Sequence, residues 1–158
     1  MPTLTENKKA RFDYDIMETF EAGLVLQGHE VKSVKTGRAK IQGAYAIIRG
    51  EEVYMVGMHI PPYQQANTPA DYDPKRTRRL LLHEEEIKNL TGKLQEKGLS
   101  LVALNAHLKR GIIKIELGLG RSRKKHDKRE VLKKRAHERE KGRSEVRAGR
   151  PTQRLAKR

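Results

Sequence analysis

Four acidic residues gather near the start of the chain at a spacing that could support metal-dependent chemistry. Asp13, Asp15, Glu18 and Glu21 lie close enough in sequence for their carboxylates to hold Mg²⁺ for nuclease chemistry. However, Asp13 and Asp15 fall on the polar face of an amphipathic strand. The six histidines have neither the spacing of a metal site nor a nucleophile partner. We therefore predict no catalytic residue, no metal site and no cofactor.

Basic residues, in contrast, are concentrated at the C-terminal end. Residues 1–120 hold 18 Lys and Arg against 15 Asp and Glu, whereas residues 121–158 hold 17 against 5. The last 38 residues thus carry +12 of the formal net charge of +15. A nearly neutral body with a basic tail is typical of a protein that binds a polyanion, because neutralised phosphates release their counterions.

The composition limits the class of protein further. A chain of 158 residues has room for one domain and an appendage. Cysteine is absent, which excludes disulfides, thiolate metal sites and Cys nucleophiles. No apolar run approaches the roughly 18 residues of a membrane span, and the N-terminus lacks the apolar core of a signal peptide. We therefore expect a cytoplasmic protein that makes no use of a membrane.

Alternation of apolar and polar residues, which is typical of half-buried strands, recurs along the body. The segments that show it are Arg11–Ile16, Leu99–Leu108 and Ile112–Leu119. Ala44–Ile48 and Val53–Met58 are instead two apolar, β-prone runs, and the turn at Gly50 between them predicts a hairpin. Gly23 and Gly28 interrupt a further strand-like run and suggest a bulge or a close backbone approach. Residues 1–9 are polar and are predicted to be loose.

Two short helices and one long loop are predicted between these strands. Val31 and Val34 suggest a helix over residues 29–35 that ends at Gly37. Ile87, Leu90 and Leu94 recur at helical spacing and predict a second helix, with three glutamates in its first turn and Gly98 at its end. Residues 61–79 form a loop with four prolines, and a loop of this length in a small domain is usually functional.

Five or six antiparallel strands with flanking helices predict a mainly β body. An antiparallel closed barrel of the oligonucleotide-binding (OB) type fits this count best, and such barrels bind nucleic acid through strands and loops. An open antiparallel sheet with helices on one side is the alternative. We place the body at residues 1–120 and the basic tail at residues 121–158.

The tail has weak helical signals. Asp127 followed by Glu130 resembles an N-cap with its capping-box partner, so a helix is predicted from Lys128 to Lys141, about 21 Å long. Only three of its residues are apolar, and such a helix is marginal in water. We predict that residues 121–158 are largely disordered in the free protein and fold on phosphates, and that helix beyond Gly142 is doubtful.

Three long segments resemble a known family. They are NKKARFDYDIMETFEAGLVLQGHEVKSVKTGRA (Asn7–Ala39), DPKRTRRLLLHEEEIKNL (Asp73–Leu90) and HDKR (His126–Arg129). In this order they are similar to the small protein B family, the SsrA-binding (tmRNA-binding) proteins of bacterial ribosome rescue. The resemblance covers roughly residues 7–129.

The resemblance implies a function in trans-translation. The OB-fold body is expected to bind the tRNA-like domain of tmRNA and to stand in for an anticodon arm. The complex would deliver alanyl-tmRNA, together with elongation factor Tu, to a stalled ribosome. The tail would occupy the decoding site of the small subunit and the empty mRNA channel, and the nascent chain would be tagged for degradation.

The resemblance also implies roles for individual residues. The family positions that contact tmRNA match Asn7, Glu21, Leu81 and Lys114. The decoding-centre contacts match His126, Asp127, Lys128 and Arg129. Tail cations are expected to contact phosphates, and they are Arg121, Arg123, Lys124, Lys125, Lys133, Lys134 and Arg135. Phe12, His107 and Ser122 depart from the family pattern, in which His, an aromatic residue and Gly are common at these places.

Ordinary structural roles remain open for the same residues. Glu21 and Lys114 could be solvent-facing strand residues, and Leu81 could belong to the core. Tyr63 and Tyr72 could stack on bases, but packing within the loop is favoured. A generic ribosomal or initiation-factor-like OB protein is the alternative function, and it would reside on all ribosomes rather than on stalled ones.

Overall fold

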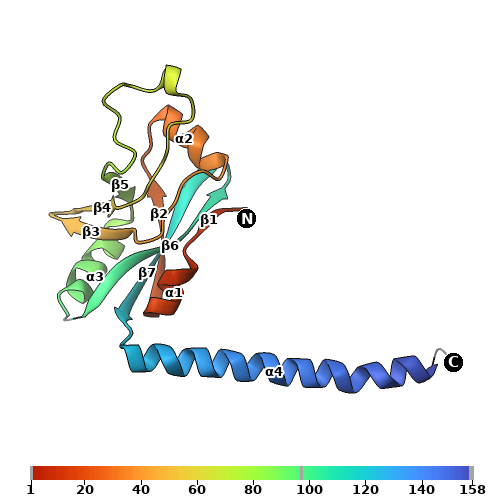
Figure 1. Cartoon of the computed structure of the whole chain (residues 1–158). Helices are drawn as coiled ribbons and strands as arrows, with labels where there is room; N and C mark the ends of the chain where they lie inside the picture. The colour runs from red at the N-terminus through yellow and green to blue at the C-terminus, as the bar shows by residue number, and fades with distance from the viewer. Residues whose placement is uncertain (1, 97, 157–158) are drawn as a thin grey trace. The chain divides into compact units, whose positions relative to one another are not determined.

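The computed structural model describes residues 2–96 and 98–156, without the side chains of residues 125, 126 and 143–156. The chain divides into two units, Met1–Ser122 and Arg123–Arg158, which are described separately (Figure 1). The last strand of the first unit ends at Ser122, two residues beyond the predicted end of the body. No helix among the described residues is both long and apolar enough to cross a membrane.

The first unit is built on one antiparallel sheet of seven strands. They are β1 (Thr3–Glu6), β2 (Tyr14–Leu24), β3 (Tyr45–Arg49), β4 (Glu52–Val56), β5 (Arg78–Leu81), β6 (Leu99–Lys109) and β7 (Ile112–Ser122). Their order is β1-β6-β3-β4-β5-β2-β7, and β7 also pairs with β6. Six strands therefore pair in a ring, while β1 joins the end of β6 that β3 leaves free.

The inner side of the ring holds the hydrophobic core. Side chains alternate in and out along the strands, and the alternation is interrupted only where the register shifts in β2 and β6. Buried core residues from the strands include Phe20, Ala22, Val53, Met55, Leu80, Leu101, Ala103, Ile115 and Leu117. The prediction of a mainly β body with flanking helices is confirmed.

The strands β2 and β7 approach each other closely at Gly120. A Cβ atom at this position would lie 3.0 Å from the carbonyl carbon of Asp15 and closer still to its oxygen. Only glycine leaves room for this approach, and it lies beside the irregularity that interrupts the β2–β7 register between Ile16 and Glu18.

Three short helices flank the strands, namely α1 (Lys8–Asp13), α2 (Gly28–Lys35) and α3 (Glu84–Leu94). The predicted helices after Gln27 and His83 are confirmed, as is the hairpin of β3 and β4. Gly37 follows α2 with φ +79°, a left-handed conformation that glycine adopts at low cost.

The N-terminal segment was predicted wrongly. Residues 1–9 were expected to be loose, but Thr3–Glu6 forms β1 and Lys8 begins α1. Residues 11–13 were expected in a strand but belong to α1, which Asn7 caps by accepting a hydrogen bond from the Ala10 N–H at 3.1 Å. The cap determines a helix here despite the alternating pattern.

Two further expectations need correction. Gly23 was expected to mark a bulge or a close backbone approach. Its pairings with β5 and β7 are regular, so no bulge lies there, and the irregularity in β2 lies nearer the start of the strand. The long loop ends earlier than predicted, because Arg78 and Arg79 already belong to β5. A single turn of 3-10 helix, η1 (Gln65–Asn67), lies inside the loop.

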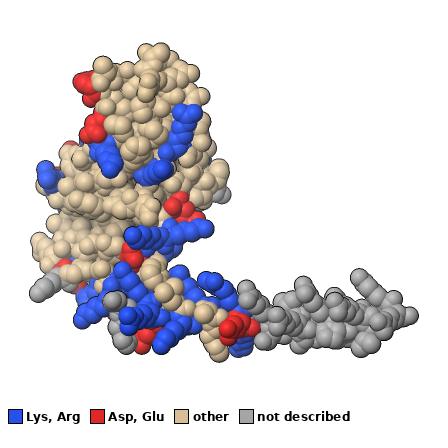
Figure 2. Space-filling model, viewed as in Figure 1, with Lys and Arg blue, Asp and Glu red and all other residues tan. Residues whose placement is uncertain are grey.

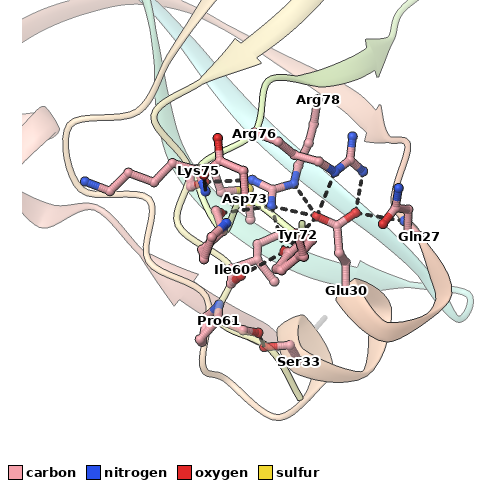
Figure 3. Close-up of polar contacts among 12 residues, drawn as sticks. Gln27, Glu30, Ser33, Ile60, Pro61, Tyr72, Asp73, Lys75, Arg76 and Arg78 are labelled. Carbon is pink, nitrogen blue, oxygen red and sulfur yellow. Dashed lines mark hydrogen bonds and ion pairs between the residues drawn. The ribbon is translucent and has the colours of Figure 1, made fainter. Parts of the chain in front are cut away.

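A buried ionic network ties the long loop to α2 (Figure 3). The Glu30 carboxylate accepts hydrogen bonds from Arg78 Nε at 2.7 Å and from Arg76, and neither Glu30 nor Arg78 is exposed. Arg78 also donates to the carbonyl oxygens of Met58 at 2.7 Å and Pro74 at 3.0 Å. The loop is therefore fixed at its C-terminal half rather than loosely connected.

The tyrosines of the loop confirm the expectation of packing. The Tyr72 hydroxyl lies 2.8 Å from the Ile60 carbonyl oxygen, and its ring meets the His29 ring edge to face at 4.7 Å. The Arg38 guanidinium lies over the Tyr63 ring, 5.5 Å from its centre. Both tyrosine rings therefore make contacts within the protein.

The second unit consists of one helix, α4 (Lys125–Ala156). It begins three residues earlier than predicted and continues beyond Gly142, where helix was considered doubtful. Asp127 is not the N-cap; it lies in the first turn, and its carboxylate accepts a hydrogen bond from the Lys124 N–H at 3.3 Å. This is the reverse bond of a capping box, made by the third helical residue.

Candidate nucleic-acid interface

Three of the four body residues expected to contact RNA lie on one outward face. Gly23 of β2 pairs with Leu81 of β5 on one side and with Lys114 of β7 on the other. Glu21 lies two residues before Gly23 and therefore on the same face of the sheet. We call this the outer face of β5, β2, β7 and β6; the residues that meet on it come from three distant parts of the chain.

The outer face continues onto β6 through a chain of polar contacts. Lys114 pairs in register with His107, whose Nε2 lies 2.7 Å from Glu21 Oε1. Lys109 Nζ donates to the other oxygen of Glu21 at 3.1 Å. The second ring nitrogen of His107, Nδ1, lies 2.8 Å from Asn105 Oδ1. Glu21 is thus held from β6 across the width of β7.

The same chain extends to α1. The Asn105 amide nitrogen donates to Glu116 of β7, and Arg11 Nη2 lies 3.4 Å from the same carboxylate. Glu116 pairs in register with both Glu21 and Asn105, so the two glutamates are neighbours on adjacent strands. The bonds to His107, Lys109 and Arg11 offset the repulsion expected between two carboxylates so placed.

The electrostatics of the outer face suit an RNA partner. The hydrogen bonds from His107 and Lys109 lower the pKa of the Glu21 carboxyl, so it is ionised at neutral pH. Its side chain is 35% exposed and keeps lone pairs for amino or hydroxyl donors of a ligand. The Lys114 side chain forms no hydrogen bond or ion pair with any described residue, so its charge is available to a phosphate.

Apolar side chains border these polar groups. Leu81 is 52% exposed, Val25 43% and Ile112 57%. Val25 follows Gly23 by two residues, and Ile112 precedes Lys114 by two, so all three lie on the outer face. The reading of Leu81 as a core residue is therefore wrong, and its exposed surface can lie against a base or a ribose.

Asn7 differs from the other three residues because it is buried. Its amide nitrogen donates to the carbonyl oxygens of Ala103 at 3.0 Å and Ile41 at 3.3 Å, while its oxygen caps α1. The backbone N–H of Asn7 donates to Leu104 at 2.8 Å. The structure thus places Asn7 where it joins β1, α1 and β6 rather than on the outer face.

The acidic residues considered for magnesium chemistry are dispersed. Glu18 pairs with Lys93 of α3, Glu21 pairs with His107 and Lys109, and Asp13 ends α1. Within the described part of the chain, no group of three or more His, Cys, Asp and Glu residues could hold a metal ion.

Basic side chains gather on the first turns of α4 (Figure 2). The expected contacts Arg129, Lys133, Lys134 and Arg135 are exposed there, while Lys128 is half-buried and Asp127 is exposed beside it. Arg121 is the last residue but one of β7, and its Nη2 lies 3.7 Å from Glu96 Oε2, whereas Arg123 and Lys124 precede the helix. His126 and Lys125 belong to α4, but their side chains lie outside the described residues.

The sequence interpretation missed the contact chain that holds Glu21. Asn105, His107 and Lys109 occupy every second position of one strand, and Lys114 and Glu116 occupy every second position of the next. This alternation within a hairpin predicts that the five polar side chains share a face. Their connection to Glu21 and Arg11 depends on strand pairings that no local pattern reveals.

Comparisons with known proteins agree with the observed fold. The model of the SmpB protein family matches residues 4–147. An SsrA-binding protein from Synechococcus elongatus is 49% identical over 137 residues, which cover 87% of this chain and 89% of the relative. An SsrA-binding protein from Burkholderia lata is 50% identical over 147 residues, covering 93% and 99%.

A solved structure is similar as well. It is described as "tmRNA-SmpB: a journey to the center of the bacterial ribosome", and one of its chains is 40% identical with a TM-score of 0.65. The match covers 84% of this chain and 95% of the other. With the family match and relatives about half identical over nearly their whole length, the chain belongs to the SmpB family of SsrA-binding proteins.

Proposed function

We propose that this protein binds the tRNA-like domain of tmRNA through its outer face and brings alanyl-tmRNA to stalled ribosomes. The single observation that carries this proposal is the meeting of Glu21, Leu81 and Lys114 around Gly23. These are the positions expected to contact RNA, and they combine an ionised acceptor, an apolar surface and an available cation. Folded RNA offers a matching set of donors, bases and phosphates.

The partners follow from the same proposal. The pair of protein and tmRNA would enter the ribosome with elongation factor Tu, and the protein would stand where an anticodon arm normally lies. We further propose that the ring of strands is a closed OB-type barrel, since such folds bind RNA on exposed strands. The protein would then act in the cytoplasm, without a membrane and without catalysis of its own.

The second unit has a separate role in this proposal. The basic tail, residues 121–158, would occupy the decoding site and the empty mRNA channel, where His126, Asp127, Lys128 and Arg129 would meet the small subunit. The other tail cations would bind phosphates. Messenger RNA in the channel would exclude the tail by volume and charge, which restricts action to vacant ribosomes. The proposal assumes a tail that is disordered when free, because so polar a helix is marginal in water.

Two sets of variants separate the roles. Truncation after Ser122 should leave binding to a transcribed tRNA-like domain intact and abolish peptide tagging in a reconstituted translation system. Glu21→Gln and Lys114→Gln should weaken RNA binding while a tail-dependent association with empty ribosomes persists. Loss of RNA binding on truncation would contradict this division, and equal residence on all ribosomes would favour the generic ribosomal alternative.

Asn7 needs a different test because it is buried. We infer that it affects RNA binding by holding β1, α1 and β6 in place. Asn7→Ala should therefore lower the free energy of unfolding by about 1–3 kcal/mol, since buried carbonyl groups lose their donors. A fully stable Asn7→Ala protein that fails to bind RNA would instead indicate direct contact.

A further inference from the structure

The imidazole of His107 is the central link of the contact chain on the outer face. Its side chain is only 11% exposed, and both ring nitrogens have oxygen partners. Nε2 lies 2.7 Å from Glu21 Oε1, and Nδ1 lies 2.8 Å from Asn105 Oδ1. The ring therefore connects β2 to β6 through two short polar contacts.

Both partners of the ring are hydrogen-bond acceptors. An ionised carboxylate such as that of Glu21 can only accept. The Asn105 amide nitrogen donates to Glu116, another carboxylate, so the amide orientation is fixed and its oxygen faces the ring. Each ring nitrogen must then carry a hydrogen. A neutral imidazole has one N–H, so only the imidazolium makes both bonds.

Several charged groups lie around the ring. Those that belong to its contact chain or face it in register are Glu21 of β2, Lys109 of β6, Lys114 and Glu116 of β7, and Arg11 of α1. Strand β1 presents the uncharged Thr3 opposite the ring. Lys109 and Arg11 are bonded to the carboxylates, and among these five charged groups it is Glu21 that contacts the ring directly.

We propose that His107 is a positioning residue for RNA binding, which orients Glu21 and makes the affinity of the outer face for RNA depend on protonation of the imidazole. This inference rests on the proposed function of the outer face. When the ring loses a proton, either Glu21 or Asn105 loses its donor. The outer face also loses a positive charge beside Lys114. Both changes weaken RNA binding, so affinity falls as pH rises.

The experiment measures the dissociation constant of a transcribed tRNA-like domain at constant ionic strength between about pH 6 and about pH 8.5. The wild-type protein should bind about tenfold more tightly at the lower pH, because a charge-assisted hydrogen bond is worth about this factor. His107→Phe keeps an aromatic ring but cannot titrate. The dissociation constant of this variant should not change with pH, and it should be close to that of the wild-type protein at the higher pH.

Two controls isolate the ring. His83→Gln changes an exposed histidine that precedes α3, and it should retain the wild-type pH profile. A ¹H–¹⁵N spectrum of the wild-type ring should show hydrogen on both nitrogens at about pH 6, and Glu21→Gln should reduce this protonation at the same pH. Thermal melts show whether each variant is folded, and His107→Gln replaces the Phe variant if that one is not.

The possible outcomes distinguish the two proposals. If wild-type and His107→Phe proteins prefer the tRNA-like domain over a control RNA with identical pH profiles, the role of His107 is overturned while the proposed function stands. A ring with one unprotonated nitrogen at about pH 6 would overturn it as well. If no preference for the tRNA-like domain exists at any pH, the proposed function fails first.

Discussion

Arg78 and Glu30 form an ion pair in which neither side chain is exposed, with 2.6 Å between Arg78 Nη2 and Glu30 Oε2. Arg76, the Tyr72 hydroxyl and the Gln27 N–H also bond to this carboxylate, so with Arg78 four other points of the chain depend on it. The pair joins the end of the long loop to α2 and thereby fixes the start of β5, which carries Leu81.

Breaking this pair should destabilise the protein strongly. Arg78→Met leaves the Glu30 charge buried with fewer donors, and we expect a loss of about 3–5 kcal/mol in the free energy of unfolding. The neighbouring Arg79 provides a matched control, because its pair with Glu52 is exposed. When both variants are unfolded in urea, Arg79→Met should lower the free energy of unfolding by less than about 1 kcal/mol. Similar costs for both variants would refute the buried pair as a main stabilising contact.

The ionisation of Glu30 should make the stability of the protein depend on pH in the acidic range. Burial by itself would raise the pKa of Glu30, but hydrogen bonds from Arg76, the Gln27 N–H and Arg78 lower the pKa from 4.5 to about 2. A carboxyl whose pKa is lowered in the folded state stabilises the protein above its unfolded pKa. This contribution should disappear as the pH falls from about 4.5 to about 2. Wild-type stability should fall more steeply in this range than that of Glu30→Gln, and parallel curves would contradict the assignment.

Two glycines should respond oppositely to the same substitution. Gly120→Ala places a Cβ against the Asp15 carbonyl group, which backbone pairing holds in place, and should cost at least about 2 kcal/mol. Gly92 lies inside α3 with no atom within 4 Å of its Cβ position. Gly92→Ala should therefore stabilise the protein by about 0.5–1 kcal/mol, because alanine favours helix. Thermal or urea unfolding gives both values, and a neutral Gly120→Ala would show that the strands can separate at this point.

The charge of Lys114 should be visible in the salt dependence of RNA binding. If Lys114 contacts a phosphate, Lys114→Gln should reduce the slope of log affinity against log salt by about 0.7 to 0.9. Lys88 of α3 serves as the control, because it is exposed and faces Glu84 of its own helix at 3.6 Å. Lys88→Gln should leave the slope unchanged. Equal slopes for all three proteins would indicate that Lys114 makes no phosphate contact.

Local sequence patterns correctly predicted those helices and strands for which a single short-range signal was strong. The hairpin around Gly50 and the helix after His83 agree with the sequence, because glycine conformation and apolar spacing are short-range properties. The N-terminus did not follow its alternating pattern, since the Asn7 side-chain oxygen caps a helix while its amide nitrogen is held by the carbonyl oxygens of Ile41 and Ala103. Those partners lie far away in sequence and could not be inferred from the neighbours of Asn7.

The candidate interface was predictable only in part. Family resemblance identified Glu21, Leu81 and Lys114 as positions of interest, and the structure brings them together around Gly23. Composition gave no indication that His107 would hold Glu21, because the two residues lie 86 positions apart. The buried pair of Glu30 and Arg78 was missed for the same reason: each residue has an ordinary place in its local sequence.

The pairing of Tyr14 with Ser122 has a consequence for how the molecule is made. Strand β7 is the last of the seven to be synthesised, yet it pairs with β2, which is among the first, and it carries Lys114. Contacts this distant form slowly and only when both strands are available. A copy whose translation stops early would lack the strand between Glu21 and His107. Unfinished molecules would therefore not compete with complete ones for the same RNA.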